Sequence, residues 1–364
     1  MSVTGTRPTA DTQFLNFFRA LAALWVVIGH CFQWGGTSLF PLPTPGMAVD
    51  LFMVISGFLM LFTVDRARKG GGWVRDFYLR RFFRIAPAYY VALIAVFILQ
   101  GPYRDGMAFF QAANPDRWGA RYLISNFPPI DPANLAMHVS FLFGLLPQYA
   151  DSTMLPDWSL GLEMQFYAVF PALYFAARYR RFLPIALGLC VACIGGRMIY
   201  FRAAEAGWVE PFREPSLLLF CLPMFVTGML IHEARDKSWS WAAVGIAVLA
   251  LLELRAHGLS GMPVIGLVTL LAACWLYRID LLKRWCESRV VSFASNCSYS
   301  VYLIHGFVLF LIGPLVSFSP LLMTLVVVTL SYLLSWLSFL YVETPGIALG
   351  KVFATRKFSA PPMV

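Results

Sequence analysis

The first apolar segment of the chain, residues 14–34, contains two ionisable side chains, Arg19 and His30. Ionisable side chains are costly inside a segment of membrane-spanning length, so they indicate a function by default. Eleven helical positions at about 100° each return to the same helix face, about 16 Å further along. One face of one helix would therefore carry a permanent cation near one end and a titratable imidazole near the other. This pattern suits a reaction that reaches from one side of a bilayer into it.

Two acidic residues occupy positions from which they could meet His30. Asp50 lies near the start of the apolar segment 46–65, and Glu163 lies near the start of the segment 160–177. A carboxylate beside a histidine fixes its tautomer and stabilises the imidazolium, which is the usual way to orient a general base. Simpler interpretations stay open, because either acid could stabilise a helix N-terminus and His30 could be a packed core histidine.

A group of basic residues precedes the third apolar segment. Arg80, Arg81 and Arg84 lie within Arg-Arg-Phe-Phe-Arg-Ile-Ala-Pro, residues 80–87, and the expected topology places them at the same membrane face as Arg19. Guanidinium groups recognise phosphates through forked hydrogen bonds, so a phosphorylated ligand is a natural partner. Taken alone, the same basic run is more typical of a topology anchor that faces anionic lipid.

The elements that must position these side chains are membrane-spanning helices. The chain has 364 residues, of which 59% are hydrophobic and only 13% charged, and its mean hydropathy is +0.69. A soluble domain has about a quarter of its residues charged. We therefore predict an all-α, polytopic transmembrane bundle in one domain, residues 1–345, with a short cytoplasmic tail, residues 346–364. The expected spans lie near residues 14–34, 46–65, 84–100, 160–177, 182–200, 215–232, 240–254, 262–278, 296–315 and 320–341.

The distribution of charge predicts the orientation and the partners of the bundle. Most of the 28 lysines and arginines fall in alternate segments between the spans, which places the N- and C-termini in the cytoplasm. This clustering at span ends points to a lipid bilayer and not to nucleic acid, although the net charge is +9. Residues 101–158 would form a long outer loop, in which the apolar residues 136–146 are too short to cross the membrane. We expect them to form an interfacial or re-entrant helix.

The seven cysteines lie in or beside apolar segments and do not form an extracellular disulfide framework. Cys190 and Cys193 have a C-x-x-C spacing but lie in a hydrophobic helix without a second pair. Buried thiols are the expected outcome, and we expect no metal cofactor.

Several motifs in order resemble the acyltransferase-3 family of integral membrane acyltransferases. Arg19 and His30 match the R-x10-H of its first helix, and residues 298–305, Ser-Tyr-Ser-Val-Tyr-Leu-Ile-His, match its S-Y-x-x-Y-L-x-H segment. Met164 departs from the family, because many relatives carry a second acid after the glutamate. The remaining matches are Val49-Asp-Leu-Phe-Met-Val-Ile-Ser-Gly-Phe58, Arg80-Arg-Phe-Phe-Arg-Ile-Ala-Pro87, Trp158-Ser-Leu-Gly-Leu-Glu163 with Phe166-Tyr167, the weaker Pro223-Met-Phe-Val-Thr-Gly228, and Val342-Glu-Thr-Pro345.

The resemblance implies about ten helices, an acyl-CoA donor (usually acetyl-CoA) and a saccharide hydroxyl as acceptor. His30 would act as general base or first accept the acyl group, with Glu163 or Asp50 orienting it. The donor's phosphates would lie on the arginines, and its pantetheine arm would pass near Ser56. The residues that the resemblance assigns to substrate or CoA binding are Arg19, Ser56, Arg80, Arg81, Arg84, Trp158, Ser159, Tyr167, Tyr302 and His305; by position alone, His305 could equally be a packing residue.

The sequence therefore predicts a bacterial inner-membrane O-acetyltransferase that modifies an exported or lipid-linked polysaccharide, such as an exopolysaccharide. It leaves open the identity of the acceptor and whether the chain forms a homodimer. The alternative is a transporter or flippase of a polar lipid or glycan without acyl chemistry. Two observations count against it: no span is obviously broken, and the Arg19–His30 face occupies a single helix.

Overall fold

The computed structural model of the protein describes residues 12–36, 44–67, 72–115, 131–153, 155–178, 182–278 and 286–355. These residues form helices and turns, and no strand occurs among them. The helices are α1 (Phe14–Trp34), α2 (Pro45–Ala67), α3 (Trp73–Ala113), α4 (Pro132–Val139), α5 (Trp158–Ala177), α6 (Phe182–Glu205), α7 (Leu218–Ala234), α8 (Trp239–His257), α9 (Met262–Tyr277), α11 (Arg289–Val316), α12 (Pro320–Ser338) and α13 (Thr344–Thr355).

The prediction of an all-α membrane bundle is confirmed. Each of the ten apolar segments predicted from the sequence coincides with a helix. Seven helical stretches in the described part of the chain are long and apolar enough to cross a membrane, two of which join consecutive helices: Phe14–Trp34, Pro45–Arg66, Trp73–Ala113, Phe182–Glu205, Trp239–Tyr277, Arg289–Val316 and Pro320–Ala354.

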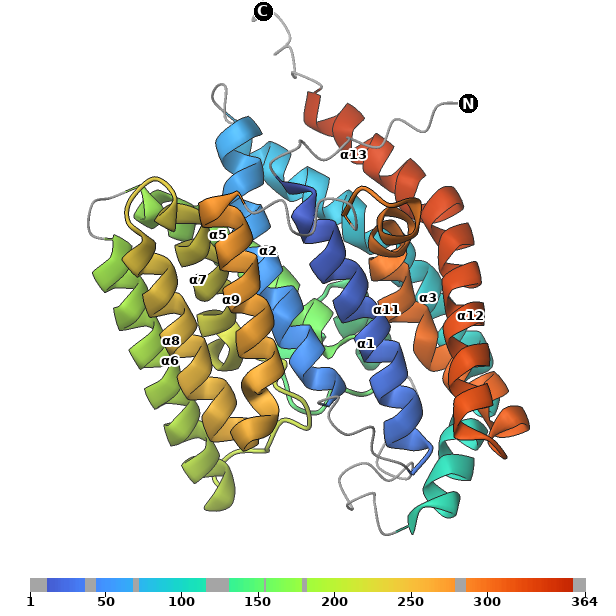
Figure 1. Ribbon diagram of the computed structural model, residues 1–364. Helices are drawn as coiled ribbons and strands as arrows, with labels where there is room; N and C mark the ends of the chain where they lie inside the picture. The colour runs from blue at the N-terminus through green and yellow to red at the C-terminus, as the bar shows by residue number, and fades with distance from the viewer. Residues whose placement is uncertain are drawn as a thin grey trace, which may run out of the picture.

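Helices α1 and α2 run through the middle of the bundle and pack on one another (Figure 1). Helices α6 to α9 lie on one side and α3, α11 and α12 on the other, with α2 packed on α7 and α1 packed on α11. We call the end where α1 begins and α2 ends the arginine end, because Arg19 lies in the second turn of α1. The opposite end, where α1 ends and α2 begins, is the histidine end.

The close packing of α2 on α7 depends on two glycines. A Cβ atom at Gly57 would collide with the backbone carbonyl of Phe225, and one at Gly228 would collide with the carbonyl of Val54. The two backbones therefore touch directly, as small residues allow in membrane helix pairs. This contact fixes α2, and with it Ser56, against the α6–α9 side of the bundle.

Helix α3 is longer than the sequence predicts. We expected a span over 84–100 followed by a loop, but the helix runs without a break through 41 residues and includes Pro87 and Pro102. The prediction ended at the charged residues on one side and at Gly101-Pro102 on the other. The helix continues past both, and just beyond its far end the Asn114 side chain donates to the carbonyl oxygens of Trp34 and Phe110.

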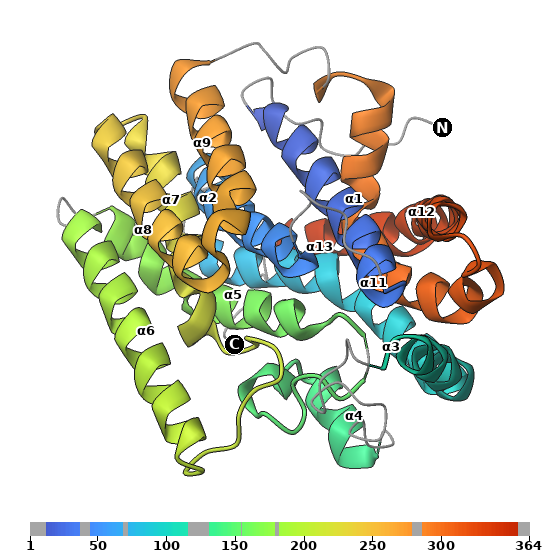
Figure 2. The ribbon, with the colours of Figure 1, turned by 60° about the horizontal axis from the view of Figure 1, so that its bottom comes forward.

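The segment between α3 and α5 folds back against the middle of α3. It contains α4, seen below α5 in Figure 2, and the 3-10 turn Phe143–Leu145. The Tyr90 hydroxyl donates to the carbonyl oxygen of Val139 at 2.8 Å, and the ring of Phe141 lies 5.1 Å from that of Tyr89. The short helix expected within 136–146 is therefore α4 and the turns after it, while residues 116–130 lie outside the described residues.

A buried polar network holds this segment in place. The Asp157 carboxylate accepts hydrogen bonds from the hydroxyl groups of Tyr89 and Thr153, both at 3.0 Å, and lies 3.2 Å from His138 Nδ1. His138 Nε2 lies 3.1 Å from the Ser152 hydroxyl oxygen, and both side chains are buried. Because Asp157 is the residue before α5, the network fixes where α5 begins.

The last described helix, α13, lies at the arginine end. Residues 346–355 of the segment predicted as a tail lie in α13, which packs along α3. The rings of Phe83 and Phe353 stack at 5.2 Å, and Arg75 donates to the carbonyl oxygen of Phe353. Residues 356–364 lie outside the described residues.

Candidate active site

The histidine that the sequence singles out is paired with a second histidine. His30, in α1, and His305, in α11, stack with ring centroids 5.0 Å apart, and His305 Nε2 lies 3.2 Å from His30 Nδ1. His305 is 2% exposed and His30 is half-buried. The two rings therefore form a stacked pair at the interface between α1 and α11.

The contacts of the two rings indicate their tautomers. His30 Nδ1 lies 3.0 Å from the carbonyl oxygen of Val26, and His305 Nδ1 lies 3.1 Å from that of Val301. A carbonyl oxygen only accepts, so both Nδ1 atoms carry a proton. His305 Nε2 is then the unprotonated nitrogen that faces His30. Nε2 of His30 keeps a lone pair and has no hydrogen-bond partner among the described residues, which is the state that a general base requires.

A pair of hydroxyl groups lies beside His305. The Ser159 hydroxyl donates to the Tyr302 oxygen at 2.8 Å, and the ring of Tyr302 lies 6.1 Å from that of His305. Ser159 is the second residue of α5, after Trp158. The buried network at Asp157 therefore sets the position of the helix turn that carries this hydroxyl.

The second group lies towards the arginine end, around Glu163. We call it the arginine group, and its members are Arg19, Ser56, Arg81, Arg84, Glu163, Tyr167 and Glu343. The Ser56 hydroxyl donates to Glu163 at 3.3 Å, and the Tyr167 hydroxyl donates to the same carboxylate oxygen. The ring of Tyr167 lies 5.8 Å from the Arg81 guanidinium, which also donates to the Thr63 hydroxyl at 3.0 Å. A tyrosine, a serine and an arginine from three helices thus gather around one carboxylate.

Helix α5 connects the two groups. Ser159, Glu163 and Tyr167 are spaced four residues apart, so they lie on one face of the helix, about 6 Å apart along its axis. The first contacts the side chains around His305, and the last contacts Arg81. This polar face of α5 extends from the arginine group to the side chains beside the histidine pair.

Three of the four predicted arginines belong to the arginine group. Arg19 donates to the Ser298 hydroxyl at 2.9 Å and interacts electrostatically with Arg84 and Glu163. Arg81 and Arg84, three residues apart, share a face of α3 and are half-buried. Arg80 is exposed, so the structure does not bring it into this group.

Glu343 is a member of the arginine group that our sequence analysis did not select as a site residue. It is 5% exposed, accepts a hydrogen bond from the Ser300 hydroxyl, and acts electrostatically on Arg19 and Arg84. It closes the π-helical turn Phe339–Glu343, a geometry found frequently at functional sites. The signal for it is the Glu-x-Pro of residues 343–345, which was noted only as part of the resemblance.

Asp50 lies apart from both the histidine pair and the arginine group. It shares a cluster with Glu253 and His257 at the histidine end, and neither Asp50 nor Glu163 contacts His30. The position that we assigned to a carboxylate beside His30 is occupied by His305. The structure thus joins His30 with His305, Tyr302 and Ser159, and separately joins Glu163 with Ser56, Tyr167 and the arginines.

Comparison with known proteins extends the resemblance seen in the motifs. Residues 12–340 match the model of the acyltransferase-3 family, which is described as an acyltransferase domain. No solved structure matches the chain significantly. The family match includes the histidine pair and the members of the arginine group other than Glu343.

Three curated relatives are similar over most of the chain. The peptidoglycan O-acetyltransferase OatA of Listeria monocytogenes is 24% identical, over 91% of this chain and 55% of that protein. The acyltransferase MdmB of Streptomyces mycarofaciens is 26% identical, over 81% of this chain and 77% of that protein. The exopolysaccharide production protein ExoZ of Rhizobium meliloti is 27% identical, over 71% and 75%. The chain thus spans about half the length of the first of these relatives.

Proposed function

Because this chain belongs to the acyltransferase-3 family and is an acyltransferase, we propose that it moves an acyl group, with acetyl as the expected group, from cytoplasmic acyl-CoA to a hydroxyl of an exported or lipid-linked polysaccharide. Two of the relatives are named for a polysaccharide, peptidoglycan in one and exopolysaccharide in the other. Family membership favours acyl chemistry over the transporter alternative. The protein would lie in a bacterial inner membrane with its arginine end towards the cytoplasm.

The arginine group would bind the donor. Arg19, Arg81 and Arg84 converge from two helices, and guanidinium groups suit the phosphates of coenzyme A. Glu163 and Glu343 keep the group from being an uncompensated cluster of positive charge before the donor binds. The pantetheine arm would then follow the polar face of α5 past Ser56 and bring the thioester to the histidine pair.

His30 would act as the general base. Its Nε2 takes the proton of the acceptor hydroxyl as the hydroxyl oxygen forms a bond to the thioester carbonyl carbon. The carbon–sulfur bond breaks, and the protonated His30 gives that proton to the departing thiolate, which leaves as coenzyme A and restores the neutral imidazole. His305 holds the His30 ring in the tautomer that this step needs. The free Nε2 of a stacked, oriented imidazole is the observation that carries this proposal.

Proximity would supply much of the rate. Holding the donor and the acceptor in a reactive geometry can offset about 7–11 kcal/mol of the barrier. The acceptor would enter from the histidine end, beside α4 and the Ser159–Tyr302 hydroxyl pair.

The test removes the base and measures the ester. His30→Ala should lower acyl transfer by at least about 100-fold, because a general base typically contributes 10²- to 10⁴-fold. The measurement is mass spectrometry of the cell's glycans with the gene deleted and then complemented by wild type or variant. The variant must accumulate in the membrane at wild-type level. Acylation that persists at the wild-type rate in His30→Ala would show that another group is the base.

A further inference from the structure

Two clusters in the described part of the chain combine two carboxylates with a histidine. One consists of Asp50, Glu253 and His257, and the other of Asp65, His232 and Glu233. In each, the candidate ligand atoms lie within 4.8 Å of one another. The two clusters lie at opposite ends of α2, since Asp50 is in its second turn and Asp65 in its last.

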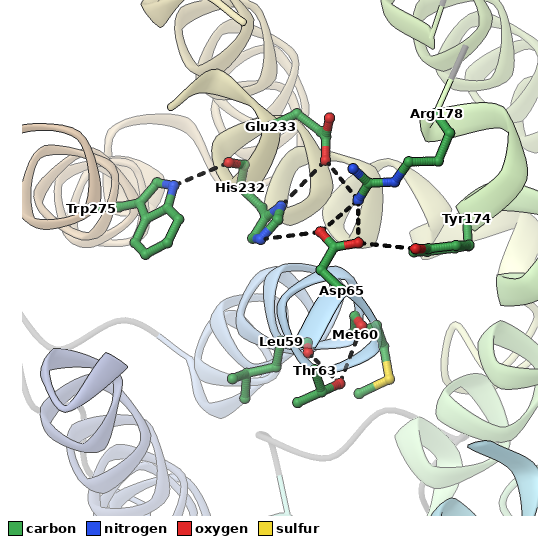
Figure 3. Close-up of polar contacts among 9 residues, drawn as sticks. All are labelled: Leu59, Met60, Thr63, Asp65, Tyr174, Arg178, His232, Glu233 and Trp275. Atoms are coloured by element: carbon green, nitrogen blue, oxygen red, sulfur yellow. Dashed lines mark hydrogen bonds and ion pairs between the residues drawn. The ribbon is translucent and has the colours of Figure 1, made fainter. Parts of the chain in front are cut away.

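The Asp65 cluster already contains a cation. The Arg178 guanidinium lies 2.5 Å from both Asp65 carboxylate oxygens and 3.4 Å from Glu233 (Figure 3). The Tyr174 hydroxyl donates to Asp65 at 3.1 Å, and His232 Nδ1 lies 3.4 Å from Glu233. A guanidinium that touches both acids takes the place of a metal ion, so this cluster is an ion-pair network that joins α2, α5 and α7.

The Asp50 cluster has no such partner. Glu253 is 1% exposed, and neither of its carboxylate oxygens receives a hydrogen bond from a donor group of the residues that the structure describes; the polar side chain that lies against it is the Asp50 carboxyl. The Arg197 guanidinium influences Asp50 electrostatically. Within the described residues, however, no lysine or arginine forms an ion pair with Asp50 or Glu253. Burying the Glu253 carboxylate beside Asp50 without an ion-pair partner destabilises the fold, because burial removes the water that would solvate the negative charge.

The local fold closes this cluster on one side. Gly261, in the turn between α8 and α9, approaches so closely that a Cβ there would lie 3.0 Å from Glu253 Cβ. Glu253 and His257 are four residues apart and share a face of α8, and Asp50 faces them from α2. Three potential metal ligands from two helices therefore converge on a point where no described lysine or arginine forms an ion pair with the carboxylates, although Arg197 acts electrostatically on Asp50 and His257.

We propose that Asp50, Glu253 and His257 bind a divalent cation of the zinc class. Two carboxylates and one imidazole provide three ligands, and tetrahedral zinc accepts such a mixed oxygen and nitrogen set with water in the fourth position. Magnesium and calcium prefer oxygen ligands alone, so the histidine favours a transition-type ion. The ion would join α2 to α8 at the histidine end. It takes no part in the acyl transfer proposed above, and Asp50 becomes a ligand.

The test measures binding of zinc alone to the full-length, tag-free protein in detergent. Equilibrium dialysis against ZnCl₂ followed by elemental analysis should give one zinc per chain. Replacing zinc with Co²⁺ should give visible absorption typical of a tetrahedral oxygen and nitrogen site. Absence of saturable binding to the wild-type protein would overturn the proposal.

Matched variants locate the site. Glu253→Gln and His257→Ala should each weaken zinc binding at least tenfold, whereas Glu233→Gln, in the cluster filled by Arg178, should bind zinc as the wild type does. Glu253→Gln keeps the shape of the side chain, and His257→Ala lies at the last residue of α8, which keeps the test open if one variant fails to fold. Unchanged binding in His257→Ala, or loss in Glu233→Gln alone, would refute the assignment.

Discussion

At the scale of single residues, the proposed mechanism assigns donor binding and proton transfer to two separate groups of side chains. Arg19 and His30 lie on one face of α1, but each acts with partners from other helices. Arg19 joins Arg81 and Arg84 around Glu163 and Glu343, whereas His30 joins His305. Removing an arginine should therefore affect the donor first, and removing His30 should affect the chemical step.

The arginine prediction can be made with adjacent residues. Arg81→Ala should raise the apparent KM for acetyl-CoA by about 10-fold or more, since hydrogen bonds to charged groups contribute about 1.5–3 kcal/mol. Arg80→Ala is the matched control, because Arg80 is exposed and lies outside the arginine group. Steady-state kinetics on purified protein measure both. Equal KM values for the two variants would indicate that these arginines serve as a topology anchor and do not bind the donor.

At the scale of elements, two devices hold the site helices in register. The glycine contact fixes α2 on α7, and the Asp157 network fixes the start of α5 on α3. The first uses close backbone packing, and the second uses buried hydrogen bonds. Each can be weakened without changing a residue of the two polar groups.

The glycine contact predicts a loss of stability. Gly57→Ala should destabilise the protein by about 1–3 kcal/mol, because the new methyl group must push the Phe225 carbonyl away. Gly188→Ala, in α6, has no atom within 4 Å of its added Cβ and should be neutral or slightly stabilising. Thermal unfolding in detergent compares the two variants. A Gly57→Ala protein as stable as Gly188→Ala would mean that the α2–α7 contact is looser than described.

The Asp157 network predicts a difference between two neighbouring tyrosines. Tyr89→Phe should cost about 1–3 kcal/mol, because it removes a donor from a buried carboxylate. One oxygen of that carboxylate already has no partner. Tyr90→Phe loses a partly exposed hydrogen bond to Val139 and should change stability by less than about 0.5 kcal/mol. Thermal unfolding and the rate of proteolysis within residues 131–157 measure the contrast, and the opposite ranking would contradict it.

At the scale of the whole molecule, the proposed reaction requires the arginine end to face the cytoplasm. The two ends of α8 offer a direct test, because Lys237, two residues before the helix, and Arg255, in its last turn, are both exposed. The seven native cysteines are all buried, so an added cysteine stands out against them.

The orientation prediction uses a membrane-impermeant maleimide on intact spheroplasts. Arg255→Cys should react before lysis, and Lys237→Cys should react only after lysis, because basic residues concentrate on the cytoplasmic side. The wild-type chain serves as the unlabelled control. Reaction of Lys237→Cys in intact spheroplasts would show that the orientation is opposite to the predicted one, and the donor could then not enter from the cytoplasm as proposed.

The sequence predicted the helices and the residue types of the site better than their contacts. Hydrophobic length located the spans, and spacing placed Arg19 and His30 on one face, because both properties belong to a single helix. The partner of His30 depends on how α1 and α11 rotate against each other, which no local pattern encodes. For the same reason we expected a carboxylate where His305 lies. Glu343 entered only through a motif, and the Asp157 network gave no signal that we recognised.

The length of α3 has a consequence for the lipid around the protein. Its 41 residues extend about 60 Å, roughly twice the hydrocarbon thickness of a bilayer. This helix carries Arg81 near one end and, beyond Pro102, contacts α11 at Gly306, next to His305. A thicker or thinner bilayer changes the tilt of such a helix. In the proposed reaction, we therefore expect bilayer thickness to change how well a thioester bound at the arginines reaches the imidazole.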